Sequence, residues 1–189
     1  MGLGKLSMTV AAGLFFATAA FADEHVGPIT QLADAKVKAW IGNSVIIDAV
    51  KAQNAKNASL SQADIDTLDK QWRAETGAGS QPMIDAVLAN ALSGFLKEQK
   101  AASNGLYTEI FVMDNKGLNV GQSDITSDYW QGDEAKWKKT FLAGTNAVHI
   151  GKVKKDESTQ KFQSQLSLPI VVAGKNIGAI TIGVNIDEL

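Results

Sequence analysis

YTEIFVMDNKGLNVGQS, at residues 107–123, carries the clearest structural signal in this sequence. Its first part, 107–113, alternates with period two and is largely apolar on both faces, as in a strand that is covered on both sides. Residues 114–117 combine Asp, Asn and Gly, which favour a tight turn. Residues 118–123 then continue as a second strand, so the stretch predicts an antiparallel hairpin.

Three further strands are predicted beyond this hairpin, at 147–154, 161–172 and 177–186. They are preceded by a polar loop at 124–132 and by a short helix in which two large aromatic residues lie one turn apart. Because each strand follows the last by a short connection, we expect a single five-stranded antiparallel sheet.

Upstream of the hairpin, the apolar residues follow the helical period. We expect a long first helix over about 29–55, a second helix that begins at the capping box of Ser61 and Asp64, and a third that runs from Pro82 to Asn104. The predicted fold class is therefore α+β. It has a helical part at 28–104 and a sheet part at 106–189.

The first 22 residues have the features of an export signal. Lys5 supplies a short positive start, an apolar stretch of small residues covers 6–20, and Ala20-Phe21-Ala22 fits a cleavage site. A retained membrane anchor is the alternative, but the uncharged stretch is at the short limit for a span. We expect residues 1–22 to be cleaved, leaving 23–189 as one soluble periplasmic domain.

Composition excludes several classes of function. The 18 Lys and Arg nearly balance the 20 Asp and Glu, which argues against a nucleic-acid-binding protein. The absence of Cys excludes disulfides, thiolate metal sites and Cys nucleophiles. The two His and the absence of a Gly-x-Ser-x-Gly sequence leave few candidates for a hydrolase triad or a zinc site. We therefore expect no enzymatic activity, no metal and no cofactor.

The loop and short helix at 123–137 contain the best candidates for a ligand site. Pockets for small polar metabolites combine aromatic walls with a few fixed polar groups, and this segment is rich in both. The side chains that we select from it are Ser123, Asp128, Tyr129, Trp130 and Trp137. The three aromatic residues form a candidate cage for a cation, with Asp128 as the counter-charge. For Trp137, the alternative is that it docks the short helix on the sheet together with Phe141.

His149, Gln165 and Ser167 complete the candidate site from the predicted strands. Gln165 and Ser167 share one strand face with Gln163. That face is either simply solvated or the floor of the pocket, and both possibilities stay open. His149 is also compatible with a purely structural place on the sheet.

Two groups of charged residues are expected to have no role in the site. The lysines around the predicted turn at 156–158, Lys152, Lys154, Lys155 and Lys161, are interrupted by acidic residues and are expected to be solvated. Arg73 is expected to form a surface salt bridge, although its guanidinium would also suit a ligand carboxylate.

Three segments resemble the extracytoplasmic Cache domain, the single PAS-like, PDC-type sensor module of bacterial chemoreceptors and sensor kinases. They are FVMDNKGLNV at 111–120, SDITSDYWQGDE at 123–134, and the closing segment from QLSLPI at 165–170 to GAITIGV at 178–184. The resemblance covers nearly all of the chain after residue 22. It implies a PAS-like sheet and an overlying loop that enclose a site for an amino acid, an amine or a carboxylate.

The resemblance also implies partners. Family members use their long first helix for parallel dimerisation, which suggests a homodimer through 29–55. They usually continue past the last strand into a transmembrane helix and a signalling domain. Because this sequence ends at Leu189, we expect a separate membrane sensor or transporter to receive the signal.

We therefore expect a periplasmic, non-enzymatic, sensor-type protein that binds a small metabolite and signals through a membrane partner. The alternative is a ligand-free interaction or adaptor module that dimerises through its N-terminal helix. A water-accessible cavity would favour the first function, and an interior filled by side chains would favour the second.

Overall fold

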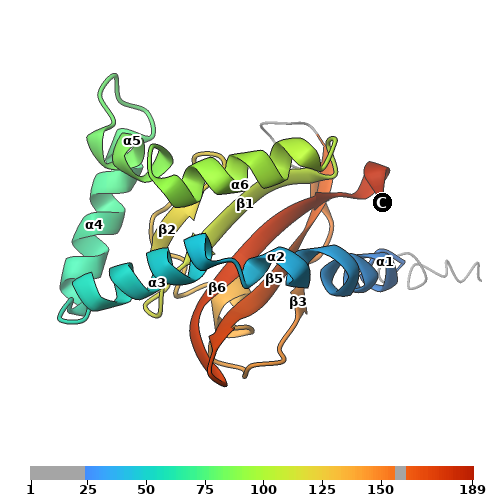
Figure 1. Ribbon diagram of the computed structural model, residues 1–189. Coiled ribbons are helices and arrows are strands. Elements are labelled where there is room, and N and C mark those ends of the chain that lie inside the picture. The colour runs from blue at the N-terminus through green and yellow to red at the C-terminus, as the bar shows by residue number, and fades with distance from the viewer. Residues whose placement is uncertain (1–23, 156–160) are drawn as a thin grey trace, which may run out of the picture.

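The computed structural model describes residues 24–155 and 161–189 (Figure 1). The expected signal peptide at 1–22 lies outside these residues. The fold is α+β, with a six-stranded antiparallel sheet among the described residues. Its order is β2-β1-β6-β5-β3, and β4 also pairs with β5. The strands are β1 (Tyr107–Met113), β2 (Asn119–Gln122), β3 (His149–Ile150), β4 (Lys154–Lys155), β5 (Phe162–Val172) and β6 (Lys175–Asn185).

The helices precede the sheet, except for one short helix and a final turn. They are α1 (Val26–Leu32), a π-helical segment (Ala33–Val37), α2 (Lys38–Ile41), α3 (Ser44–Lys56), α4 (Gln62–Glu75), α5 (Pro82–Leu88), α6 (Ala91–Ala102), α7 (Ala135–Lys138) and a 3-10 turn (Ile186–Glu188). In Figure 1, α1 to α3 and α6 lie across the sheet, while α4 and α5 lie at its β2 end. Of the helices in the described ranges, none has the length and apolar character required to cross a bilayer.

Strand β1 is covered on both faces, as its sequence predicts. Ile110 and Val112 pack in the main core beneath α1, α3 and α6. Phe111 and Met113 point to the opposite face, where they pack with α7 and the residues that follow it. There Trp137 and Phe141 stack with their ring centroids 4.9 Å apart. Trp137 therefore docks α7 on the sheet together with Phe141, the alternative to a ligand contact.

Two of the predicted helices are wrong as single helices. The first is interrupted at Gly42 and Asn43, where the Asn43 side chain accepts a hydrogen bond from the Val45 amide at 2.9 Å and starts α3. The third is interrupted before α6, where the Asn90 side chain accepts a hydrogen bond from the Ser93 amide at 2.8 Å and starts the helix. In both cases an Asn leaves the helix to act as an N-cap, while the apolar period continues across the break. The predicted end at residues 104–105 is confirmed, because both residues have positive φ.

The predicted strand at 147–154 is also wrong as one strand. It forms β3 and β4, which pair with β5 on either side of Gly151. Ile150 pairs with Leu166, and Lys154 pairs with Gln163. The segment from Ile150 to Lys154 therefore contains one more residue than the segment of β5 that it faces. Such an insertion is a β-bulge, which bends the strand and redirects its side chains.

Glu75 connects the end of α4 to the start of α5. The predicted capping box at the other end of α4 is confirmed. The Glu75 carboxylate, 7% exposed, accepts hydrogen bonds from the amides of Met83 at 2.7 Å and Ile84 at 3.1 Å. Burial acts to raise the pKa of Glu75, but the hydrogen bonds from Gln71, Ile84 and Met83 outweigh it and lower the pKa below its ordinary value.

This shift predicts a loss of stability in acid. Because the folded-state pKa of Glu75 is depressed, its contribution is fully present above the ordinary value of 4.5 and is lost as the pH falls through the folded-state pKa. We expect the melting temperature of Glu75→Gln to fall less between pH 6 and about 3 than that of the parent protein. Glu98→Gln, on the exposed face of α6, is the control. Equal pH dependence of the parent and Glu75→Gln would show that the carboxylate is not responsible.

Candidate functional site

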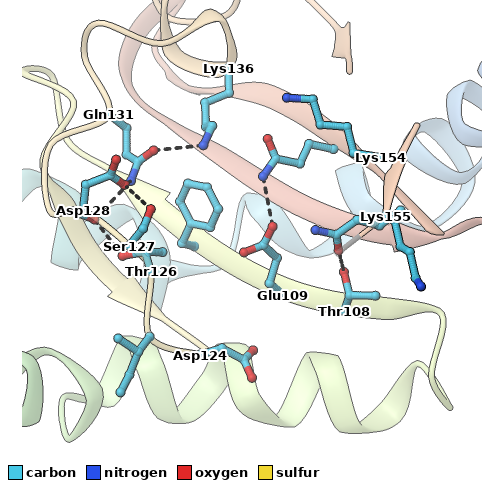
Figure 2. Close-up of a pocket in the computed structure, with 14 residues that line it drawn as sticks. Thr108, Glu109, Asp124, Thr126, Ser127, Asp128, Gln131, Lys136, Lys154 and Lys155 are labelled. Carbon is cyan, nitrogen blue, oxygen red and sulfur yellow. Dashed lines mark hydrogen bonds between the residues drawn. The ribbon is translucent and has the colours of Figure 1, made fainter. Parts of the chain in front are cut away.

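A cavity of about 500 Å³ opens between the sheet and the loop that follows β2 (Figure 2). It is continuous with a second hollow of about 660 Å³ that extends toward β3, because five residues line both. The five are Ser127, Lys136, Lys154, Gln163 and Gln165. Together the two parts form one groove on the sheet face that also carries α7.

The floor of the cavity is polar and comes from β1 and β5. Thr108 donates a hydrogen bond to Gln163, and Gln165 Nε2 donates one to Glu109 Oε1 at 2.9 Å. Both bonds cross over Gly183 of β6, where an added Cβ would lie 2.8 Å from Glu109 Cγ. A side chain on β6 would therefore displace the floor. Of the three polar residues on this face of β5, Gln163 and Gln165 line the cavity, whereas Ser167 does not.

The wall opposite the floor is the loop that carries Asp128. Its carboxylate accepts hydrogen bonds from Gln131 Nε2 at 2.5 Å and from Arg73 Nη2 at 3.1 Å. Arg73 also pairs with Asp69 at 2.7 Å, which confirms its predicted role in salt bridges. Asp69 in turn accepts bonds from the backbone amides of Tyr129 and Trp130, both at 2.9 Å. The helix α4 therefore holds the loop in place from outside the cavity.

Lys136 enters the cavity from α7, and Lys154 and Lys155 line it from β4. The Lys136 side chain is 13% exposed, and its Nζ pairs with Glu134 at 3.0 Å. Nζ also donates to Gln131 Oε1 at 3.0 Å and lies 5.2 Å from the centre of the Phe111 ring. In Figure 2, Lys136, Gln131 and Glu109 point toward the same central space. The amide of Gln131 thus lies between a cation and the Asp128 carboxylate.

The aromatic residues chosen from the loop do not line this cavity. Tyr129 is 7% exposed and stacks on Trp72 at 5.4 Å in a second core between α4, α5 and the loop. Burial, with the negative charge of Asp114, raises the pKa of its phenol. Trp130 packs against the same core and donates Nε1–H to the Lys116 carbonyl at 2.8 Å. Trp137 Nε1–H donates to the backbone carbonyl of Asp114 at 3.2 Å. The aromatic-cage prediction is therefore replaced by a packing role.

The remaining predicted residues have different places. Asp128 and Gln165 line the main cavity, and His149 lines the part near β3 with Gln165. Ser167 is fully buried and bonds to Thr181 at 2.9 Å. Ser123 is buried beside the cavity, where its hydroxyl accepts from the Ile110 amide at 2.8 Å. The structure brings together three of the eight residues selected from the sequence.

Glu109 and Lys136 are the site residues that sequence analysis missed. Glu109 is an acidic residue inside an otherwise apolar strand, and this is a signal that could have identified it. Lys136 had no such signal, because it lies in a short segment with several other lysines. Within the part of the chain that the structure describes, no three side chains of His, Asp or Glu gather as metal ligands. The chemistry available in the cavity is charge pairing and hydrogen bonding.

No family model matches the chain, and no curated protein matches its sequence. Among solved structures, the sensor domain of the V. cholerae histidine kinase DctB is similar, with a TM-score of 0.44, 12% identity, and 88% of this chain and 56% of that chain covered. The sensory domain of the Campylobacter jejuni chemoreceptor Tlp3 with isoleucine bound has a TM-score of 0.39 at 15% identity. The match covers 82% of this chain and 62% of that one.

The ligand-binding domain of the Pseudomonas aeruginosa PAO1 chemoreceptor PctC, in complex with GABA, has a TM-score of 0.37 at 14% identity, covering 87% of this chain and 62% of that one. The chain therefore spans less than two thirds of the length of each of these three structures. These three structures are a sensor domain of a histidine kinase and the sensory and ligand-binding domains of two chemoreceptors.

Proposed function

We propose that the chain is a non-enzymatic, sensor-type binding domain that holds a small zwitterionic metabolite, such as an amino acid, in the cavity between β1, β5 and the loop after β2. The observation that carries the proposal is the presence of both signs of charge in one cavity. Lys136 lies on one side of Gln131, and Asp128 lies on the other. An ammonium and a carboxylate on the same small molecule match this arrangement.

The size and polarity of the cavity support the same ligand class. About 500 Å³ falls within the range of small-molecule sites, which runs from roughly 300 to 1,000 Å³. Glu109, Gln165 and Thr108 supply fixed polar groups on the floor, and Phe111 supplies an apolar surface between them. Fixed donors and acceptors of this kind orient a ligand at a small entropic cost.

The adaptor alternative has less support. It places a dimer contact on the N-terminal helix, which is interrupted at Asn43. The apolar residues Val37, Ile46 and Val50 are fully buried against the sheet. We also propose, as in the sequence analysis, that the protein is exported to the periplasm and reports ligand binding to a membrane sensor or transporter.

Binding should depend on the charges on both sides of Gln131. We expect at least one amino acid to raise the melting temperature of residues 23–189, because a ligand that binds the folded state stabilises it by mass action. Lys136→Met and Asp128→Asn should each weaken binding by about 10- to 100-fold, the usual value of a charge-assisted hydrogen bond. Isothermal titration calorimetry on the folded variants measures this change.

The matched control is Lys38→Met, which removes an exposed lysine whose ion pair with Asp34 lies on the helical face. It should bind like the parent protein. Unchanged affinity of Lys136→Met and Asp128→Asn would place the ligand elsewhere. The absence of binding across amino acids, amines and carboxylates would refute the proposed function.

A further inference from the structure

The part of the groove near β3 is strongly basic. It is lined by Lys139, Lys152, Lys154 and His149, in addition to Lys136. The single acidic residue in its lining, Glu134, already pairs with Lys136. Within residues 24–155 and 161–189, no ion pair is formed by Lys139, Lys152 or Lys154. Three lysines therefore line this hollow without an ion pair to any residue that the structure describes.

These cations come from separate parts of the chain. Lys139 ends α7, Lys152 lies in the bulged segment between β3 and β4, and Lys154 belongs to β4. Lys152 and Lys154 line the groove, and both are exposed, in keeping with the solvated lysines predicted from the sequence. Burial and the nearby charge of Lys139 lower the pKa of His149. Burial is the larger of these two causes, and the charge of Lys139 acts in the same direction.

We propose that this basic end of the groove is an oxyanion subsite, and that the preferred ligand carries a second anionic group, a carboxylate or a phosphate, in addition to its amino-acid head. This inference rests on the proposed function, which places the amino-acid part of the ligand between Lys136 and Asp128. The hollow is continuous with the cavity through Ser127, Gln163 and Gln165, so one extended ligand reaches both. An anion placed here relieves the repulsion among unpaired cations, and that relief favours an acidic ligand over a neutral one.

The test compares ligands that differ only at the distal group. Glutamate and glutamine have the same length and differ by one charge, and O-phosphoserine and serine test the phosphate. We expect glutamate or O-phosphoserine to bind to the parent protein at least about tenfold more tightly than its neutral counterpart, with a preference that weakens as salt is raised. Which of the two acidic ligands binds more tightly identifies the carboxylate or the phosphate as the preferred group.

A double variant, Lys139→Gln with Lys152→Gln, tests the subsite itself. It should abolish the preference for the acidic ligand while leaving the affinity for glutamine or serine within about twofold of the parent value, because Lys136 and Asp128 are untouched. Lys51→Gln with Lys175→Gln, two exposed lysines outside the groove, is the matched control and should retain the preference. Retention of the preference in the Lys139 and Lys152 variant would overturn the proposal.

The His149 resonance gives a readout that does not depend on amino-acid binding. Inorganic phosphate or succinate should raise the pKa of His149 in an NMR titration, since an anion bound in this hollow opposes the charge of Lys139 that lowers this pKa. His149→Gln identifies the signal, because His25 is the other histidine. Equal binding of glutamate and glutamine would overturn the subsite and leave the proposed function standing. A raised pKa without amino-acid binding would support the subsite and refute the proposed function, and an unchanged pKa without binding would refute both.

Discussion

Trp72→Ala is expected to lower the free energy of unfolding by about 3–5 kcal/mol, as for other large aromatic residues removed from a core. The Trp72 side chain is fully buried and stacks on Tyr129. Its Nε1–H donates to the Thr126 carbonyl at 2.8 Å, inside the loop that forms the cavity wall. The substitution leaves a void between α4, α5 and this loop and removes the partner of a buried carbonyl.

Urea denaturation monitored by far-UV circular dichroism gives the free energy. The control is Trp40→Ala, because Trp40 is half-buried and meets Phe95 edge to face at 6.1 Å. We expect Trp72→Ala to cost clearly more stability than Trp40→Ala. Trp72→Ala should also weaken ligand binding, since Asp128 and Gln131 lie on the loop that Trp72 supports. A cost for Trp72→Ala no larger than that of the control would mean that the second core is not needed for folding.

Asp114→Ala is expected to cost a similar amount, about 3–5 kcal/mol, because it removes a buried carboxylate that accepts four hydrogen bonds. One carboxylate oxygen of Asp114 accepts from Gln53 Nε2 at 3.1 Å and Asn57 Nδ2 at 3.0 Å. The other accepts from the amides of Lys116 at 2.8 Å and Leu118 at 3.0 Å. The residue is fully buried, so water does not replace these bonds easily.

The same denaturation experiment tests this prediction. Asp48→Ala, on the exposed face of α3, removes a carboxylate with no such network and should change the stability by less than about 0.5 kcal/mol. Asp114→Asn separates charge from shape, since it keeps the volume but replaces one acceptor oxygen by a donor. It should be destabilised to an intermediate extent. A stable Asp114→Ala variant would show that the turn does not depend on this carboxylate.

The features that sequence analysis predicted correctly are local. The turn at 114–117, the capping box at Ser61 and the helix end at Asn104 each depend on residues within a few positions of one another. The breaks before α3 and α6 are also local, but a continuous apolar period concealed the capping Asn in each of them. The bulge at Gly151 depends on which residues of β5 lie opposite, and this is not decided by the segment itself.

The site was harder to predict, because its residues meet only through the order of the strands. Glu109 and Gln165 lie on β1 and β5, and β6 runs between those strands. Tyr129 and Trp130 were misplaced for a different reason. An aromatic side chain in a polar loop has the same sequence pattern whether it packs on a ligand or on Trp72 of a distant helix. Only the packing of α4 against the loop decides between these two roles.

The strand order also has a consequence for folding kinetics. The β1–β2 and β5–β6 hairpins close through short turns, whereas pairing of β1 with β6 must close the long connection that contains β2 to β5. Closing a longer loop costs more entropy, and contacts distant in sequence form more slowly. The two hairpins should therefore form early and dock late. Because the cavity floor spans β1 and β5, the proposed binding surface does not exist until β6 has paired with both strands.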